Sequence, residues 1–266
     1  MAVDKPEAKP RSPIRNEPLR LPGQSIEEAR RAGWDEVETP VLAVVFAWIL
    51  VFQEWSALLV PTRMGPVSMT IIAVLVTAWA VPKIRAYWRK DADYQLGRKG
   101  ELAVAECLES LRAQGFRPLH DIVAGRFNVD HVLIGPPGIF AIETKTRRKS
   151  GGREEKVLVD GSRILIAGRS AEPNPADQAK GNAAWVRGLL ARSTGREFRV
   201  DPVVVFPGWW VEFNQKPNGL FVMNEKGFEN IIAKLPATLT KEEIAMAAFH
   251  LEQFVRATAS NSKSKS

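Results

Sequence analysis

Cysteine and histidine are scarce in this sequence, which has a single cysteine, Cys107, and only three histidines. One thiol excludes an internal disulfide and fits a reducing compartment. The three histidines are scattered along the chain (His120, His131, His250), so the four Cys or His ligands of a structural zinc site are missing. No signal peptide is expected, because the first apolar run begins only near Val41.

Acidic residues are fewer than basic ones, with 30 Asp and Glu against 37 Lys and Arg, which gives a net charge of +7. This excess favours an acidic partner, either nucleic acid or anionic lipid, although many soluble proteins are equally basic. The hydrophobic content of 45% and the charged content of 25% are typical of a folded protein. Composition therefore admits both kinds of partner and does not choose between them.

Both ends of the chain are rich in polar residues. Residues 1–36 contain many Pro, Lys, Arg and Glu, which predicts a disordered segment followed by a short helix over 25–36, with Ser25 and Glu28 at a capping-box spacing. The tail 259–266 is also expected to be disordered.

Two apolar runs, 41–60 and 64–81, are separated only by "PTR". Each approaches the ~20 residues that a helix needs to cross a bilayer, which predicts a transmembrane helical hairpin over 37–82. Alternatives are two buried helices of a soluble core or a dimerisation hairpin of a soluble protein. The following segment, 83–95, is predicted to be a linker, and its basic residues place both termini on the cytoplasmic side of a multi-pass membrane protein (Lys83, Arg85, Arg89, Lys90).

The pattern of a soluble α/β domain begins near residue 96. A helical stretch ending at Gly115 precedes a predicted strand–turn–strand, "VDHVLIGPPGIFAIETK", then a second hairpin with Asp160 and Gly161 at its turn. A helix with Asn174 as N-cap and an apolar strand, "FRVDPVVVFP", follow. This order indicates a mixed sheet flanked by helices. Residues 207–258 are expected to add a Trp-rich turn, a short strand and one or two helices.

Charged residues interrupt the first predicted hairpin at Asp130, Glu143 and Lys145. Its loop is expected to be the four residues "GPPG", because two prolines cannot supply the positive φ of a tight two-residue turn. Positions that sum to 273 then pair, so Asp130 faces Glu143 at a Cβ separation of about 5 Å. Lys145 lies on the same face, two residues further along.

Two carboxylates so close repel each other unless a proton or a cation lies between them. Mg²⁺ or Mn²⁺ suits such oxygen ligands, and Lys145 would stabilise charge on a phosphate. Glu101 lies on the apolar face of its helix and is a further candidate ligand, or simply an acid near a helix N-terminus. Gln178 would reach the same sheet edge, or make a packing hydrogen bond.

A basic run, "TRRKSGGR", follows Lys145. It would bind nucleic-acid phosphates near the site, or it is a solvated loop. Its cationic residues are Arg147, Arg148, Lys149 and Arg153.

The order "GRKGE", "VDHVLIGPPGIFAIETK" and "NPADQ" resembles the NERD, or nuclease-related, domain over residues 96–206. That family resembles the PD-(D/E)xK nucleases, which have a restriction-endonuclease-like fold. The resemblance implies that Glu101 is the helix-borne acid, Asp130 the strand carboxylate, and Glu143 with Lys145 the E-x-K pair. It also implies a catalytic Gln178. The long basic insertion after Lys145 departs from the family pattern.

The leading hypothesis is a membrane-anchored nuclease that uses Mg²⁺ or Mn²⁺ and cleaves DNA, with RNA as the second choice. Asp130 and Glu143 would bind the metal and Glu101 would assist. The alternative is a non-catalytic module that binds nucleic acid or protein at the membrane. Two carboxylates in the groove favour the enzyme, because they weaken the binding of phosphate.

Overall fold

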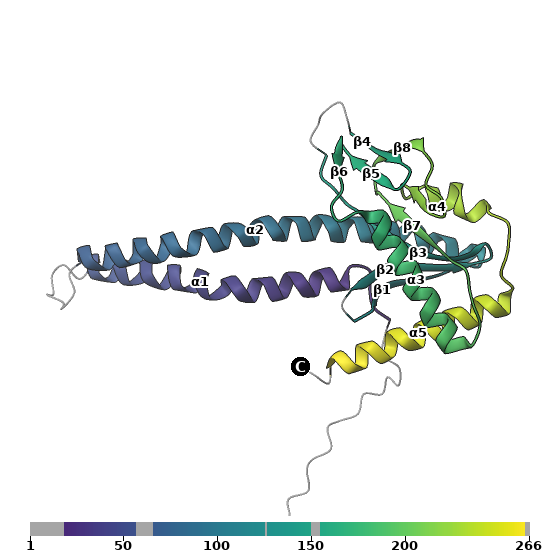
Figure 1. The fold of residues 1–266 in the computed structure, drawn as a ribbon. Helices are drawn as coiled ribbons and strands as arrows, with labels where there is room; N and C mark the ends of the chain where they lie inside the picture. The colour runs from purple at the N-terminus through teal and green to yellow at the C-terminus, as the bar shows by residue number, and fades with distance from the viewer. Residues whose placement is uncertain (1–18, 57–65, 126, 150–154, 264–266) are drawn as a thin grey trace, which may run out of the picture.

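The structure is a computed structural model that describes residues 19–56, 66–125, 127–149 and 155–263. A long helical hairpin joins an α/β domain in it (Figure 1). Helix α1 (Gln24–Ser56) and helix α2 (Pro66–Ser110) lie side by side, and both extend away from the sheet. Residues 1–18, most of the segment predicted to be disordered, lie outside the described residues.

Large apolar side chains on both helices of the hairpin are exposed, and Phe52, for example, is 76% exposed. Within the described residues, one helix is long and apolar enough to cross a membrane, the continuous helix from Pro66 to Gln114. Only 11% of its most apolar stretch is buried. The sequence predicted two spans, and a second one is not confirmed; the end of the first run, 57–60, lies outside the described residues.

Helix α2 runs without interruption through residues 83–95, where the sequence predicted a linker. This segment contains neither glycine nor proline, and a contact from α1 supports it, since Arg30 Nε donates to Asp91 Oδ1 at 2.5 Å. In α1 the predicted short helix and the first apolar run likewise form one helix, with Pro40 inside it. The second helix of the hairpin and the first helix of the domain are therefore one continuous helix.

Small residues and side-chain hydrogen bonds hold α1 against α2. Ala73 and Ala80 on α2 are buried. The indole N–H of Trp48 on α1 donates to Thr77 Oγ1 on α2 at 3.0 Å. That of Trp55 donates to Thr70 Oγ1, also at 3.0 Å. Close packing through small residues with interhelical hydrogen bonds is typical of helix pairs in membranes.

The main sheet has five strands in the order β1-β2-β3-β7-β9. Strands β1, β2 and β3 form an antiparallel meander, and β3, β7 and β9 are parallel to one another. Helix α3 (Pro175–Thr194) lies between β3 and β7 in the chain. The mixed α/β fold class predicted from the sequence is confirmed, with strands β1 (Arg117–Val123), β2 (Asn128–Gly135), β3 (Gly138–Thr144), β7 (Val200–Val205) and β9 (Phe221–Met223).

A second sheet of four strands has the order β6-β5-β4-β8. The turn between β4 and β5 is Gly161-Ser162, one residue later than predicted, because Asp160 pairs with Arg163. The segment predicted as a Trp-rich turn instead contributes a strand, β8, which pairs with β4 in parallel. The four strands are β4 (Lys156–Asp160), β5 (Arg163–Ile166), β6 (Arg169–Ser170) and β8 (Trp210–Gln215).

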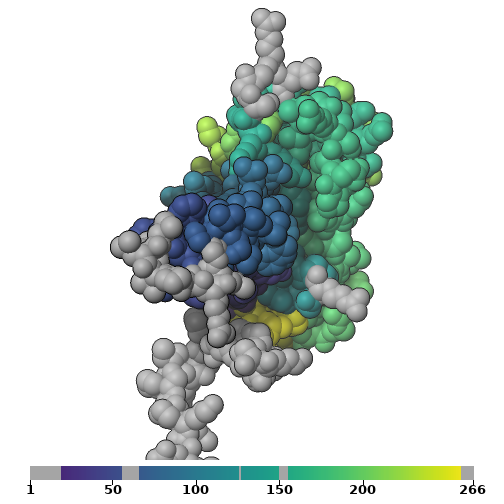
Figure 2. Space-filling view, turned by 90° about the vertical axis from the view of Figure 1, so that its left-hand side faces the viewer, coloured from purple at the N-terminus to yellow at the C-terminus, as the bar shows by residue number. Residues whose placement is uncertain are grey.

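Helices cover both faces of the main sheet. On one face α3 and α5 (Lys241–Lys263) pack against β1, β2 and β3 through residues such as Val186, Leu251 and Val132. On the other face the C-terminal part of α2 packs with α4 (Gly227–Asn230) and the 3-10 turn Ile232–Lys234. Figure 2 shows the hairpin end-on, with green α3 on one side of it and yellow α5 below.

The C-terminal extension completes this core. Strand β9 belongs to the main sheet. Helix α5 buries Ile244, Ala247 and Leu251 against the side of that sheet formed by β1, β2 and β3. Helix α5 also continues to Lys263, although residues from 259 on were expected to be disordered. The tail contains no glycine or proline that would end the helix.

The loop between β2 and β3 is tighter than predicted. Gly135 pairs with Gly138, so the loop is Pro136-Pro137 alone, and Gly138 takes a φ of +147°. The backbone N–H of Thr238 and that of Leu239 both donate to Pro136 O and hold the loop in place. The predicted sum of 273 for paired positions is nevertheless confirmed, from Gly135–Gly138 to His131–Ile142.

The packing at Gly135 gives a test of this register. A Cβ at Gly135 would lie 2.1 Å from the ring of Phe116, so we expect Gly135→Ala to lower the stability by about 1–3 kcal/mol through overpacking. Gly181→Ala is the control, since a Cβ at this helical glycine has no neighbour within 4 Å in the described structure and should be neutral or slightly stabilising. Thermal unfolding of both variants measures the difference, and equal melting temperatures would contradict the register.

Candidate active site

Glu143 and Lys145 meet at the end of β3. Lys145 Nζ lies 2.7 Å from Glu143 Oε1, and the Lys145 backbone N–H donates to Val205 O at 2.8 Å. The other carboxylate oxygen, Glu143 Oε2, accepts a hydrogen bond of 2.8 Å from Asn182 Nδ2 on α3. The Glu143 side chain is only 8% exposed, and these two donors satisfy both of its carboxylate oxygens.

Asp130 lies on β2 beside this pair. Its Oδ2 accepts a hydrogen bond of 2.7 Å from the backbone N–H of Thr144, the residue after Glu143. Burial, and then the charges of Glu143 and Glu101, raise the pKa of Asp130 well above its usual range. The predicted neighbourhood of Asp130 and Glu143 is therefore present at this end of the sheet.

Glu101 reaches the same place from α2 and is 7% exposed. Burial raises its pKa to about 7, with further contributions from Asp121 and Glu143. A hydrogen bond from the Gly23 backbone and the charge of Lys145 act in the opposite direction. The structure thus brings together the helix acid and the strand acids that sequence reasoning selected.

Gly100 explains how α2 comes so close to the end of β3. A Cβ at this position would lie 1.8 Å from Thr146 Oγ1, so no other residue type fits without displacement. The helix backbone therefore contacts the segment that directly follows Lys145. Glu101, the next residue, is carried to the acids of the sheet by this contact.

Gln178 lies near the site but makes no direct contact that defines a role. It lines a cavity of about 470 Å³ together with Glu143, Asn182 and Trp185. Its Oε1 is buried and has no hydrogen-bond partner among the described residues. A buried polar atom of this kind normally bonds a water or a ligand, so the cavity has the character of a binding site.

Sequence reasoning missed Asn182 and Asp121. Asn182 follows Gln178 by four residues, so it lies on the same face of α3, and this spacing was a usable signal. Asp121 is buried on β1 with a φ of +50° and binds the N-terminal segment, since Arg20 Nε donates to Asp121 Oδ2 at 2.6 Å. No local pattern connects residues 101 positions apart.

The predicted basic residues lie beyond Lys145. Arg147 and Arg148 line a cavity of about 480 Å³ that Arg169 of the second sheet also lines. Lys149 Nζ lies 5.5 Å from the ring centre of Trp209. Arg153 lies outside the described residues. Arg169 was not selected from the sequence, because it comes from a separate strand.

A preformed metal cluster is absent from the part of the chain that the structure describes. No group of three or more Asp, Glu, His or Cys side chains there is placed to hold a metal ion. Mg²⁺ sites commonly use only one or two carboxylates, with waters and substrate phosphate as the other ligands. Asp130 and Glu143 match that smaller ligand set.

Comparison with known proteins supports the resemblance for this part of the chain. Residues 96–207 match the family model of the nuclease-related domain, NERD. The match begins in α2, five residues before Glu101, and ends just after β7. No curated protein and no solved structure matches the chain.

The raised pKa of Glu101 predicts a pH-dependent stability. Between its usual pKa of 4.5 and about 7, the unfolded chain loses this proton and the folded protein keeps it, so stability falls as pH rises through that window. Glu101→Gln removes this titrating group, so the stability of the variant should not fall in that window. Above pH 7 the variant should be more stable than the wild type by up to about 3 kcal/mol.

Thermal unfolding in EDTA at pH 5 and pH 8 measures this effect. The stabilisation should be larger at pH 8, whereas Glu106→Gln, an exposed acid on the same helix, should show no such change. A difference between Glu101→Gln and wild type that does not vary with pH would contradict the assignment.

Proposed function

We propose that this protein is a membrane-anchored, metal-dependent nuclease that hydrolyses phosphodiester bonds of nucleic acid, most naturally DNA. The observation that carries the proposal is the convergence of Glu101, Asp130, Glu143 and Lys145 at one end of the main sheet. They come from three elements within the segment that matches the nuclease-related domain. We also assign this domain to the PD-(D/E)xK superfamily, on the basis of that residue set and the mixed sheet.

The donor set fits Mg²⁺ or Mn²⁺. Asp130 and Glu101 are desolvated carboxyl groups whose pKa values are raised by burial and by neighbouring acids, with Glu143 contributing to both. A cation would relieve that repulsion. Asp130 and Glu143 would hold the ion, and Glu101 would bind a first or second one. When bound, the ion polarises the phosphate and lowers the pKa of a water molecule.

The remaining residues position these groups. Asn182 orients Glu143 through its 2.8 Å hydrogen bond, and Lys145 would orient the attacking water or stabilise the charge that develops on the phosphate. Gln178 would bind a polar group of the substrate in the adjoining cavity. Nucleic-acid phosphates would bind to the basic residues that follow Lys145 (Arg147, Arg148, Lys149) and to Arg169, which shares their cavity. Arg153 of the same run, which lies outside the described residues, would add to this binding.

The helical hairpin would anchor the domain to a membrane. Its exposed apolar side chains do not suit a buried soluble core. Both the N-terminal end of α1 and the domain lie at the same end of the hairpin (Figure 1). We therefore propose two spans, 41–60 and 64–81, with both termini cytoplasmic, because basic residues follow the second run on the domain side.

A non-catalytic binding module is the second candidate. It is favoured by the engagement of both Glu143 oxygens with Lys145 and Asn182, which leaves the described structure without a ready metal cluster. In that case the domain would bind nucleic acid or a protein at the membrane without cleaving it.

Cleavage by the full chain in detergent separates the two candidates. Single- and double-stranded DNA and RNA are incubated with Mg²⁺, Mn²⁺ or EDTA, and we expect metal-dependent cleavage that EDTA abolishes. Lys145→Ala should reduce the rate at least 100-fold. Lys156→Ala, which removes a surface lysine paired with Glu212, is the matched control and should cleave normally. Binding without cleavage would favour the module.

Membrane fractionation tests the anchor. The protein should remain with membranes in carbonate at high pH and be released by detergent, because an inserted hairpin is held by apolar burial. Release by carbonate alone would support the dimerisation hairpin of a soluble protein. Protease protection of a tag at each terminus then tests the topology.

A further inference from the structure

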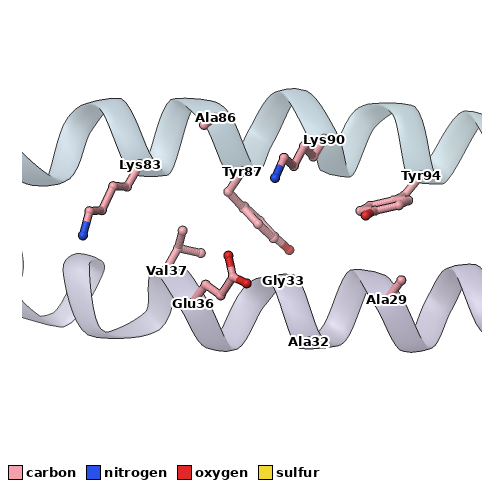
Figure 3. A pocket seen from close by; sticks show the side chains of 10 residues that line it. All are labelled: Ala29, Ala32, Gly33, Glu36, Val37, Lys83, Ala86, Tyr87, Lys90 and Tyr94. Carbon is pink, nitrogen blue, oxygen red and sulfur yellow. The ribbon is translucent and has the colours of Figure 1, made fainter.

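A groove separates α1 from α2 where the hairpin approaches the domain (Figure 3). It has a volume of about 610 Å³. On α1 it is lined mainly by small residues, Ala29, Ala32 and Gly33, whereas α2 contributes Lys83, Tyr87, Lys90 and Tyr94. The small residues of one helix leave room for the long polar side chains of the other.

The polar side chains of the groove form one row on α2. Lys83, Tyr87, Lys90 and Tyr94 are spaced by four, three and four residues, which places them on one face of the helix. The two lysines are about 10 Å apart along the helix axis. Two ammonium groups and two phenol groups therefore line one opening, where Glu36 is the one acidic residue among the lining side chains.

The groove begins where the exposed apolar surface of the hairpin ends. Trp79, which is half exposed, ends the run of exposed large apolar residues that begins at Val67 on α2, and the next one, Trp88, comes nine residues later. Lys83 follows one turn later, and its Nζ lies 4.1 Å from the ring centre of Trp79. An amphipathic molecule would thus find apolar surface and cationic donors in direct succession.

We propose that this groove binds the headgroup of an acidic phospholipid, with its phosphate oxygens between Lys83 and Lys90 and its acyl chains along the apolar surface of the hairpin. Basic pockets between membrane helices on the cytoplasmic side bind anionic headgroups in this way. The inference rests on the proposed membrane anchor and is independent of the nuclease chemistry. Basic residues that flank a membrane helix attract any anionic surface. A groove with two lysines and two tyrosines would instead select one headgroup.

The test uses the full chain in neutral detergent micelles. Native mass spectrometry counts the lipids retained when phosphatidylglycerol or phosphatidylcholine is added, and we expect one retained phosphatidylglycerol. Lys83→Gln combined with Lys90→Gln should weaken its binding at least 10-fold. Arg85→Gln combined with Arg89→Gln removes the same charge from exposed positions that do not line the groove, and should change binding less than 2-fold.

A second pair of variants fills the groove without changing its charge. Gly33→Leu should exclude the headgroup, whereas Gly33→Ala should not, because a Cβ there lies at an ordinary 3.7 Å from the Tyr87 ring. Equal losses in the lysine and arginine pairs, or equal retention of both lipids, would overturn the site. Inorganic phosphate that binds the lipid-free protein and competes with the lipid would assign the groove to a soluble anion instead.

The membrane anchor is tested separately from this site. Release of the protein by carbonate would contradict both the membrane anchor and the lipid site. Retention in membranes without a preference for phosphatidylglycerol would contradict the lipid site alone and would still support the anchor.

Discussion

The position of the candidate site depends on helix α2, which spans 45 residues without a break and carries both the apolar surface of the hairpin and Glu101. About 30 Å of continuous helix separates Val81 from Glu101, so a tilt of the hairpin moves the acid with it. The contact of Gly100 with Thr146 sets where the helix meets the sheet. A hairpin and a site that share one helix are mechanically coupled, whereas a flexible linker would have separated them.

The site brings several carboxyl groups together away from water, and removing their charges from water costs free energy. Glu101 and Asp130 respond with raised pKa values, while Glu143 is held by Lys145 and Asn182. Asp121 is buried against Arg20 of the N-terminal segment. Gly23, just before α1, also donates a backbone hydrogen bond to Glu101. Arg20 and Gly23 therefore lie against the acids of the site.

The hairpin and the domain present different surfaces to their surroundings. The hairpin exposes large apolar side chains over much of its length and offers a lysine- and tyrosine-lined groove next to the domain. The domain instead offers a polar cavity at Gln178 and an arginine-lined cavity beyond Lys145. The proposed lipid site and the proposed nucleic-acid site would therefore lie on different parts of the molecule.

Local patterns in the sequence were enough to predict the helical pair, the mixed α/β class, the N-cap at Asn174 and the pairing that brings Asp130 beside Glu143, because hydrophobic period and strand register are short-range properties. They also selected Glu101, Lys145 and Gln178. The tertiary structure alone decided that α2 is continuous, that residues 207–258 complete the core, that Asp121 and Arg20 lie beside the acids, and that Arg169 shares a cavity with Arg147 and Arg148. Those contacts join residues from separate elements, and their existence depends on packing, which no local pattern encodes.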